Sequence, residues 1–513
     1  MRQATGQHTS VWRWTALPEL SPLAGNAVCD VCVVGAGIAG LTTAYLLTRA
    51  GLKVCVVEMN QMGGGETGRT TAHLTHALDD RYFNLEKLHG QSGAQIAAAS
   101  HTAAIDLIES IVRDEKLDCA FERLEGYLFL KPGDPADTLE RELEATHRAG
   151  LSAVEKVARA PLTSFDTGPA LRFPRQAQLH PLKYLAGLTE AILQRGGKVF
   201  TNTRAQKITG GSVATITTQA GHTITAAAVV VATNTPINDV VTIHTKQAGY
   251  QTYVIGARVP AGAVPWALYW DTGDPYHYLR LHQLDSDADL LIVGGEDHKT
   301  GQAEHPEQCF SRLEAWTRAH FPMLTGIEYR WSGEVMEPVD GLAFIGPNPS
   351  GEANVYIATG DSGNGMTHGT IAGLLLTDLI QGRQNEWAQL YDPARVTPRA
   401  LKEFVRENLD LAVYLTDWVT GGTTDEVANL PCGSGAIVRS GLRKLAVYRD
   451  AAGTLHEHSA VCTHLGCIVH WNNTEQTWDC PCHGSRFDPY GKVLHGPASR
   501  DLAPVKASKQ GAG

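Results

Sequence analysis

The sequence lacks any run of about 18 uncharged apolar residues, the length that a membrane-spanning helix requires. The N-terminal stretch MRQATGQHTSVWRWTALPEL likewise lacks the continuous apolar core of a secretory signal peptide. Basic tails and arms are also missing, and the formal net charge of -11 is spread over the whole chain. These absences argue against a membrane span and against nucleic acid or an anionic membrane surface as a partner, and they predict a cytoplasmic enzyme.

Internal repeats and low-complexity tracts are absent too. At 513 residues the chain exceeds the size at which a single hydrophobic core stops growing, so we expect two or three domains. Six of the ten cysteines are scattered without the spacing of a disulfide framework, and we interpret them as core or surface residues. The other four lie within 21 positions near the C-terminus, and this clustering indicates a metal site.

A βαβ unit is predicted from Cys29 to Glu58, because a buried strand, a glycine turn, an apolar helix and a second buried strand follow one another. Gly35-x-Gly37-x-x-Gly40 occupies the turn. The first glycine makes the bend, the second lets the backbone approach a pyrophosphate, and the third permits close packing of helix on strand. Glu58 ends the second strand, where it can accept a hydrogen bond from a ribose hydroxyl. The unit therefore predicts a dinucleotide site at the helix N-terminus.

Around these residues the sequence resembles the FAD-dependent oxidoreductases of the D-amino-acid oxidase, sarcosine oxidase and dimethylglycine dehydrogenase kind. The resemblance covers roughly residues 28–382, and four further motifs follow in the family's order: GGGETGRTTAHL (63–74), GGKVFTNTRAQKI (196–208), VVVATNTP (229–236) and ATGDSGNGMTHGTIAG (358–373). The resemblance implies bound FAD and a Rossmann-like α/β domain of the glutathione-reductase type, joined to an antiparallel-sheet substrate domain.

The resemblance also implies which residues contact the FAD. They are Gly35, Gly37, Ile38, Ala39, Gly40, Glu58, Gly65, Thr67, Arg69, Thr70, Val199, Ala232, Thr233, Gly360, Gly363, Asn364, Gly365 and Met366. Two positions depart from the family's pattern. Asn234 stands where a glycine is common, and Arg69 stands near the place where relatives with histidyl-linked flavin carry the attachment histidine, which argues against a covalent link. His73 and His76 form an HxxH pair that we interpret as surface or packing residues.

Near the C-terminus, Cys462-x-His464 is followed after 15 residues by Cys480-x-x-His483. In a Rieske [2Fe–2S] cluster two thiolates bind one iron and two imidazoles bind the other. A tetrahedral zinc site is the alternative, but a zinc finger has CxxC and HxxxH pairs instead. The segment from 426 to 506, downstream sequence RFDPYGKVLHGPA included, resembles the Rieske family. The resemblance implies Cys462, His464, Cys480 and His483 as cluster ligands.

The same resemblance extends to residues beside the cluster. Cys467 and Cys482 occupy the positions that form a disulfide in the cytochrome-complex type of Rieske protein. Ser485 keeps a hydroxyl that the resemblance implies as a donor to cluster sulfur. Phe487 stands where members of the highest potential carry tyrosine, so we expect a potential below the top of the family's range.

The expected domain organisation follows from these motifs and from the pattern of elements. Helices are predicted over residues 92–116 and 137–159, and strands between about 245 and 335. The expected parts are an N-terminal extension (1–27), a FAD-dependent module (28–382), a linker with a docking helix (383–425), a small all-β Rieske domain (426–507) and a tail (508–513). Within the module, FAD binding is assigned to about 28–85, 165–244 and 335–382, and substrate binding to about 86–164 and 245–334.

Four residues are candidates for the catalytic site. Tyr276, Tyr278 and Arg280 alternate along a strand and are expected to share one face. Arg280 is a candidate to bind a carboxylate in bidentate fashion, although a solvated strand arginine fits the sequence as well. Lys299 lies in the region where sarcosine-oxidase-like relatives keep a lysine near the flavin, although a surface turn lysine fits there too.

The function predicted from both resemblances is oxidation of an amine or amino acid at its C–N bond, with hydride transfer to the flavin and passage of electrons through the Rieske cluster to an external acceptor. The partners expected are this small-molecule substrate and that acceptor. Three alternatives remain open at the level of the sequence: a Rieske oxygenase, an electron-transfer or redox-sensing protein that turns over no amine, and a cluster that only stabilises the fold. An oxygenase needs a mononuclear iron site of two histidines and one carboxylate, and no such triad stands out in the sequence.

Overall fold

The computed structural model describes residues 8–238, 243–303, 305–401, 414, 416–418, 422–423 and 427–505. The docking helix predicted in the linker falls mainly on residues 402–413, and the predicted tail on 508–513, both of which lie outside the described residues. Among the helices of the described residues, none has the length and apolarity that crossing a membrane requires.

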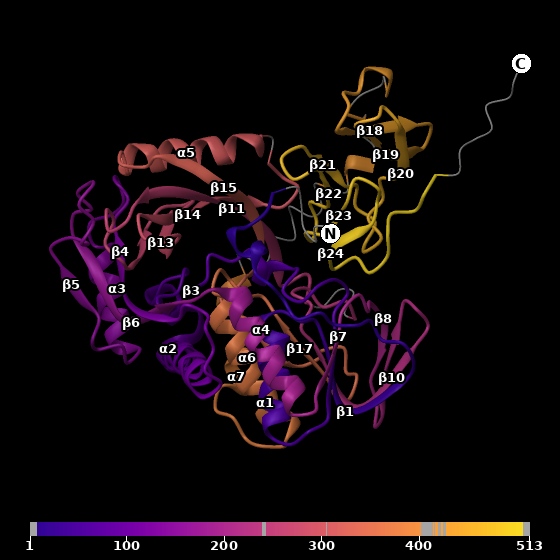
Figure 1. Ribbon diagram of the computed structural model, residues 1–513, viewed down its shortest axis with the longest axis horizontal. Helices are drawn as coiled ribbons and strands as arrows, with labels where there is room; N and C mark the ends of the chain where they lie inside the picture. The colour runs from indigo at the N-terminus through magenta and orange to yellow at the C-terminus, as the bar shows by residue number, and fades with distance from the viewer. Residues whose placement is uncertain are drawn as a thin grey trace, which may run out of the picture.

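The chain forms three groups of elements, which Figure 1 shows. The helices are α1 (Ile38–Arg49), α2 (Tyr82–Asp114), α3 (Thr138–Arg148), α4 (Pro181–Gln194), α5 (Glu307–His320), α6 (Gly365–Ile380) and α7 (Ala388–Tyr391). The strands of the first sheet are β1 (Ala27–Val34), β2 (Val54–Val57), β7 (Lys198–Phe200), β8 (Ala205–Thr209), β9 (Ala214–Thr218), β10 (Thr223–Val231), β16 (Phe344–Pro347) and β17 (Val355–Thr359).

A second sheet and two small sheets complete the described residues. The second sheet contains β3 (His73–Leu74), β4 (Glu122–Phe129), β5 (Glu155–Val157), β6 (Ala170–Gln178), β11 (Gln247–Pro260), β12 (Leu268–Asp271), β13 (Tyr278–Gln283), β14 (Ala288–Lys299) and β15 (Gly326–Pro338). The small sheets contain β18 (Ser434–Ser440), β19 (Arg443–Arg449) and β20 (Leu455–Ser459), and β21 (His470–Asn472), β22 (Thr477–Asp479), β23 (Arg486–Phe487) and β24 (Val493–His495).

The first sheet is the dinucleotide-binding layer. Its order is β16-β17-β10-β1-β2-β7, and β1 runs parallel to both β10 and β2. The central strands are valine-rich and buried, as expected for a parallel sheet that is covered on both faces. Helix α1 packs against α4 and α6, and Figure 1 shows these helices together beside the sheet. Because α1 begins directly after β1, its N-terminus lies at the carboxyl end of the sheet, where ligands bind in such folds.

The second sheet is mostly antiparallel, as the predicted fold class requires, and it includes β3 and β6 from ranges assigned to FAD binding. Its order is β15-β11-β14-β13-β12-β4-β6-β3. Helix α5 covers it (Figure 1) and buries Phe310 and Leu313 against β11 and β14. Each such buried side chain stabilises the fold by about 1.5–3 kcal/mol. The helix predicted over 137–159 is wrong in its second half: α3 ends at Arg148, Gly150 takes a left-handed φ of 97°, and β5 follows.

The C-terminal β domain, defined here as residues 427–505, holds both small sheets around a core of its own. Trp478 and Phe487 are fully buried in that core beside the predicted cluster cysteines. The fold class predicted from the sequence is confirmed: an α/β dinucleotide-binding layer, an antiparallel substrate layer and a small all-β domain. Figure 1 shows the C-terminal β domain beside both large sheets rather than separated from them.

Candidate active site and cluster site

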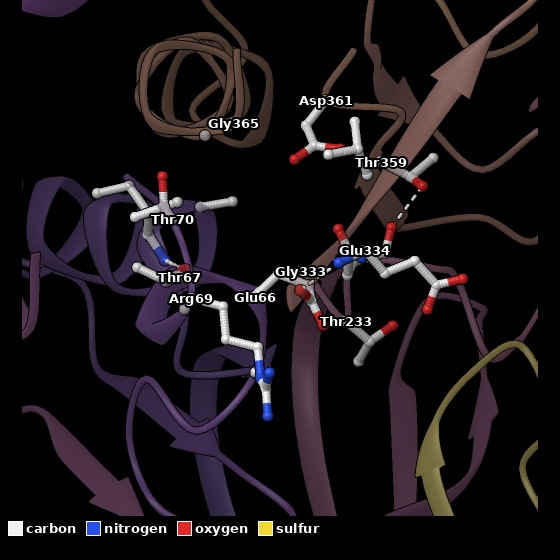
Figure 2. Close-up of a pocket in the computed structure, with 18 of the residues that line it drawn as sticks. Glu66, Thr67, Arg69, Thr70, Thr233, Gly333, Glu334, Thr359, Asp361 and Gly365 are labelled. Atoms are coloured by element: carbon white, nitrogen blue, oxygen red, sulfur yellow. Dashed lines mark hydrogen bonds between the residues drawn. The ribbon is translucent and has the colours of Figure 1, made fainter. Parts of the chain in front are cut away.

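A single cavity runs between the two large sheets and reaches the C-terminal β domain. It is lined by the turn after β1, by the loop of residues 58–71, by the strand ends near 232 and 359, and by residues 493–499 of the β domain. Figure 2 shows Thr67, Arg69 and Thr70 on one wall of this cavity and Thr359 and Asp361 on the opposite wall, with Thr233 and Glu334 between them. The cavity is therefore built from all three parts of the chain.

The turn after β1 has no room for a side chain at two of its glycines. Gly35 has a φ of 110°, and a Cβ atom on it would lie 2.4 Å from the Ala232 carbonyl oxygen. A Cβ atom on Gly40 would lie 2.0 Å from the Gly35 carbonyl oxygen. Side chains at either position would push the α1 N-terminus away from β1 and β10. Gly37, Ile38 and Ala39 at this N-terminus line the cavity, and the positive end of a helix favours an anionic pyrophosphate.

Glu58 is hydrogen-bonded to the backbone of the same turn. Its carboxylate accepts hydrogen bonds from the Ala36 N–H and the Asn60 N–H, each at 2.9 Å. Burial raises the pKa of this carboxyl. Glu58 also lines the cavity, so it stands where a ribose hydroxyl could donate to it.

Most residues predicted to contact FAD line the cavity. They are Gly35, Gly37, Ile38, Ala39, Glu58, Gly65, Thr67, Arg69, Thr70, Ala232, Thr233, Gly363, Asn364, Gly365 and Met366. Three predicted residues do not line it. Gly40 lies against Gly35, Val199 is buried within β7, and Gly360 lies against Pro338. On the side assigned to the adenine, Arg204 and Ala205 line the cavity instead of Val199.

The end of the cavity under the second sheet has aromatic and acidic walls. Tyr276, Tyr278 and Trp270 line it, and the centroids of the two tyrosine rings lie 5.2 Å apart. Asp79 and Asp297 line it as well, and the Tyr276 hydroxyl donates to Asp79 Oδ2 at 2.8 Å. Two of the four predicted catalytic residues, Tyr276 and Tyr278, are thus brought to this end.

The other two candidates lie elsewhere. The Arg280 guanidinium donates to the carbonyl oxygens of Ala72 and Leu179, at 3.0 and 3.2 Å, and it does not line the cavity. Both bonds come from Nη1, and Arg280 lines a second pocket instead of this cavity. Lys299 ends β14 and does not line the cavity either.

The four predicted cluster ligands come together on two loops of the C-terminal β domain. Cys462 and Cys480 are buried, and the rings of His464 and His483 lie edge to face with centroids 4.9 Å apart. Hydrogen bonding with Cys480 lowers the pKa of the Cys462 thiol against the effect of burial, and the Ser485 hydroxyl adds to this. Burial lowers the pKa of His483 to about 3, so the ring is neutral, the form that ligates a metal.

Cys467 and Cys482 form a disulfide that ties the two ligand loops together. Three sulfur atoms, those of Cys467, Cys480 and Cys482, lie within 4.8 Å of one another, but the bridge uses two of them. Only Cys480 of this group therefore remains to bind a metal. Two thiols and two imidazoles on bridged loops fit the ligand set of a Rieske cluster.

The two histidines of the ligand set, His464 and His483, lie next to a residue of the FAD-dependent module. The His244 ring lies 4.8 Å from that of His464 and 6.2 Å from that of His483, between centroids. Nearby, His495 Nδ1 lies 2.9 Å from Glu334 Oε2, and Asn234 Nδ2 lies 3.0 Å from His495 Nε2. The dinucleotide layer and the C-terminal β domain thus meet between the cavity and the ligand set.

A model of the FAD dependent oxidoreductase family matches residues 30–379, and a model of the Rieske [2Fe-2S] domain matches residues 418–506. The chain belongs to the FAD-dependent oxidoreductase family and carries a Rieske domain. It is therefore an oxidoreductase that uses FAD and a [2Fe–2S] cluster. The cavity and the four-ligand loops fit these two groups.

Three known proteins illustrate what this chain is similar to. The chain is 32% identical to YhfW of Bacillus subtilis, a protein named for a Rieske 2Fe-2S centre, over 96% of each chain. It is 27% identical to gamma-glutamylputrescine oxidoreductase of Escherichia coli, over 73% of this chain and 90% of that one. Its fold matches the crystal structure of glycine oxidase from Geobacillus kaustophilus, with a TM-score of 0.59 and 18% identity over 72% of this chain and all of the other.

Sequence reasoning missed two sets of cavity residues. Asp79 and Asp297 stand outside every motif, and only their three-dimensional meeting marks them. Residues 493–499 belong to the Rieske motif region, yet they also line the FAD cavity. A sequence carries no signal for that contact between domains.

Proposed function

We propose that this oxidoreductase removes a hydride from the carbon beside a substrate nitrogen and passes the electrons through its Rieske cluster to an external acceptor. The proposal rests mainly on the closeness of the two redox sites. Residues between 493 and 499 of the C-terminal β domain, which holds the cluster ligands, line the cavity assigned to FAD. FAD, when bound, accepts two electrons as a hydride equivalent, and a [2Fe–2S] cluster takes electrons singly.

The residues of the chain supply position and environment for this chemistry. We assign Gly35, Glu58 and the α1 N-terminus to holding the dinucleotide. Tyr276 and Tyr278 would hold the substrate against the flavin and exclude water from it, because both side chains line the cavity and are partly buried there. The names of the relatives include an amine, gamma-glutamylputrescine, and an amino acid, glycine, so both classes belong in the test.

The test is an anaerobic mixing experiment with the full-length protein carrying both cofactors. N-methylated glycines, D-amino acids and diamines are added in turn, and the flavin absorbance and the carbonyl product are measured. We expect at least one compound to bleach the flavin and to yield an equivalent of aldehyde or oxo acid. A Gly35→Val variant, which cannot close the nucleotide turn, should show no bleaching and no product. If every amine leaves the flavin of the unaltered protein oxidised, the proposal is wrong.

A further inference from the structure

Four carboxyl groups lie at or beside the acidic end of the cavity: Asp79, Asp297 and Glu337 line it, and Asp80 shares the Ser362 hydroxyl with Glu337. Asp80 and Glu337 are both engaged by the Ser362 hydroxyl, at 3.0 and 2.8 Å. Burial raises the pKa of each of these two groups. They can therefore share protons and need no outside partner. Asp79 and Asp297 line the open part of the cavity and remain to be explained.

A β-bulge directs Asp297 into the cavity. Gln251 pairs with His298 and Tyr253 pairs with Gly295, so one residue of β11, Thr252, faces two residues of β14. One of those two, Glu296, has a left-handed φ of 61°, which costs free energy in a residue other than glycine. The bulge sends Glu296 outward to Arg312, at 2.5 Å, and leaves Asp297 on the cavity side. Bulges of this kind commonly re-aim a side chain at a functional site.

The Asp297 carboxylate lacks a complete set of partners within the protein. Its Oδ1 atom is shielded from solvent and has no hydrogen-bond partner among the described residues. Burial raises the pKa of Asp297 to about 7 and that of Asp79 to about 6. A buried carboxylate without a counter-charge is costly, and a bound cation would remove that cost.

No side chain of the described lining neutralises these two carboxylates. The lining contains no lysine, and its two arginines are engaged elsewhere: Arg69 donates to the Ser332 and His8 carbonyl oxygens, and Arg204 donates to the Ser499 carbonyl oxygen. Burial lowers the pKa of His73 to about 3, so this neighbouring ring is neutral. Arg81, which lies outside this lining, lowers the pKa of Asp79, but among the described residues no such cation acts on the pKa of Asp297. A cationic ligand would supply the charge that Asp297 lacks.

The aromatic walls favour the same kind of ligand. Trp270, Tyr276 and Tyr278 surround the acidic end, and aromatic faces attract ammonium groups by cation–π interaction. Arg280, the residue expected to bind a carboxylate, is held by backbone carbonyls away from the cavity. Two carboxylates and three aromatic rings at this end thus favour a cation, and the arginine expected to bind a carboxylate lies outside the cavity.

We propose that the substrate is a diamine or polyamine without a carboxylate, whose two ammonium groups are bound by Asp79 and Asp297 between these aromatic walls. This assignment rests on the proposed amine oxidation, and it names the substrate class for that site. When both carboxyl groups are ionised, a ligand with two positive charges can pair with each of them, which a ligand with one charge cannot do.

The test measures binding separately from oxidation. Calorimetry with the full-length protein carrying both cofactors compares 1,4-diaminobutane with butylamine, which lacks the second charge, and with 4-aminobutyrate, which replaces it by a carboxylate. We expect the diamine to bind at least about tenfold more tightly than butylamine, and 4-aminobutyrate to bind most weakly. Asp297→Asn should weaken diamine binding about tenfold to hundredfold, as for loss of a charged hydrogen bond. The exposed Asp287→Asn is the matched control and should change nothing.

The outcomes separate this assignment from the proposed oxidation. If the diamine binds through Asp297 while no amine bleaches the flavin, the substrate-class assignment stands and the oxidation falls. If glycine or N-methylglycine binds more tightly than the diamine, the assignment is overturned even when the flavin is bleached. It is also overturned if metal analysis finds one Mg²⁺ or Ca²⁺ per chain that competes with the diamine. If the Asp297→Asn variant loses its flavin absorbance, its binding data cannot be used. The Asp79→Asn variant and the comparison of ligands on the unaltered protein then test the assignment.

Discussion

At the scale of single residues, we propose that Glu58 links the glycine turn to the dinucleotide. Its carboxylate accepts two backbone N–H groups and lines the cavity. Replacing it by glutamine keeps the shape but removes the charge, so Glu58→Gln should weaken FAD binding about tenfold or more. Fluorescence titration of the FAD-free protein with FAD measures this, and the exposed Glu144→Gln serves as the control. Unchanged affinity in Glu58→Gln would contradict the assigned role.

The raised pKa values of Asp79 and Asp297 predict how pH affects diamine binding. A carboxyl whose pKa is raised keeps its proton until the pH exceeds that value, so the anionic form that attracts a cation is gained as the pH rises through about 6 and about 7. Diamine affinity should increase at least about tenfold between pH 5 and pH 8, and protons should be released on binding below pH 7. Affinity that stays flat or falls over this range would count against the acidic pair. The other charged groups that act on the pKa values of the pair are Arg81, which lowers that of Asp79, and Asp80, Glu296 and Asp274, which raise them.

At the scale of elements, the disulfide between the two ligand loops should hold the cluster site together. The bridge joins cysteines 15 positions apart, and closing a loop of this length stabilises a fold by about 3 kcal/mol. A Cys467→Ala/Cys482→Ala variant should therefore lose its cluster absorbance at lower denaturant concentration than the unaltered protein. The FAD absorbance should be lost at an unchanged concentration. Cys432→Ala, which removes an exposed free cysteine, is the control.

Some of these elements could be predicted from the sequence and others could not. The βαβ unit was predictable because Gly35 and Gly40 must be glycine for close backbone approach, and such a requirement is local. The boundary after α3 was not, because a glycine at position 150 can either sit within a helix or end it, and tertiary packing decides. Asp297 was missed for a different reason. The bulge that aims it into the cavity depends on pairing between β11 and β14, which periodicity along one strand cannot reveal.

At the scale of the whole molecule, a polar and buried interface fixes the C-terminal β domain on the FAD module. Ser332 donates to Glu475 at 2.7 Å, and Asn472 donates to Gln251 at 3.2 Å. Closer to the cluster loops, Gln302 donates to the Pro481 carbonyl oxygen at 3.0 Å. Directional contacts of this kind specify one docking orientation more than they add stability.

This interface predicts a variant that slows only the transfer between the two redox sites. Gln302→Ala combined with His470→Ala removes two docking contacts, the second being His470 Nδ1 with the Gly301 carbonyl oxygen at 3.0 Å. Cluster reduction should slow severalfold, because each lost hydrogen bond costs about 1 kcal/mol of docking. Flavin reduction should keep its rate, since neither residue lines the cavity. Stopped-flow absorbance resolves the two steps, and the exposed Gln283→Ala is the control. Equal slowing of both steps would show a general loss of structure instead.

We propose that electrons from an amine reach the cluster through the flavin within one chain. The most direct test mixes the anaerobic protein with a compound that bleaches the flavin and follows the flavin absorbance together with the cluster's EPR signal. We expect the flavin to bleach first and the EPR signal of the reduced cluster then to grow in the same turnover. A flavin that stays oxidised with every amine, while NADH and a reductase reduce the cluster, would contradict it and would assign the chain to electron transfer alone.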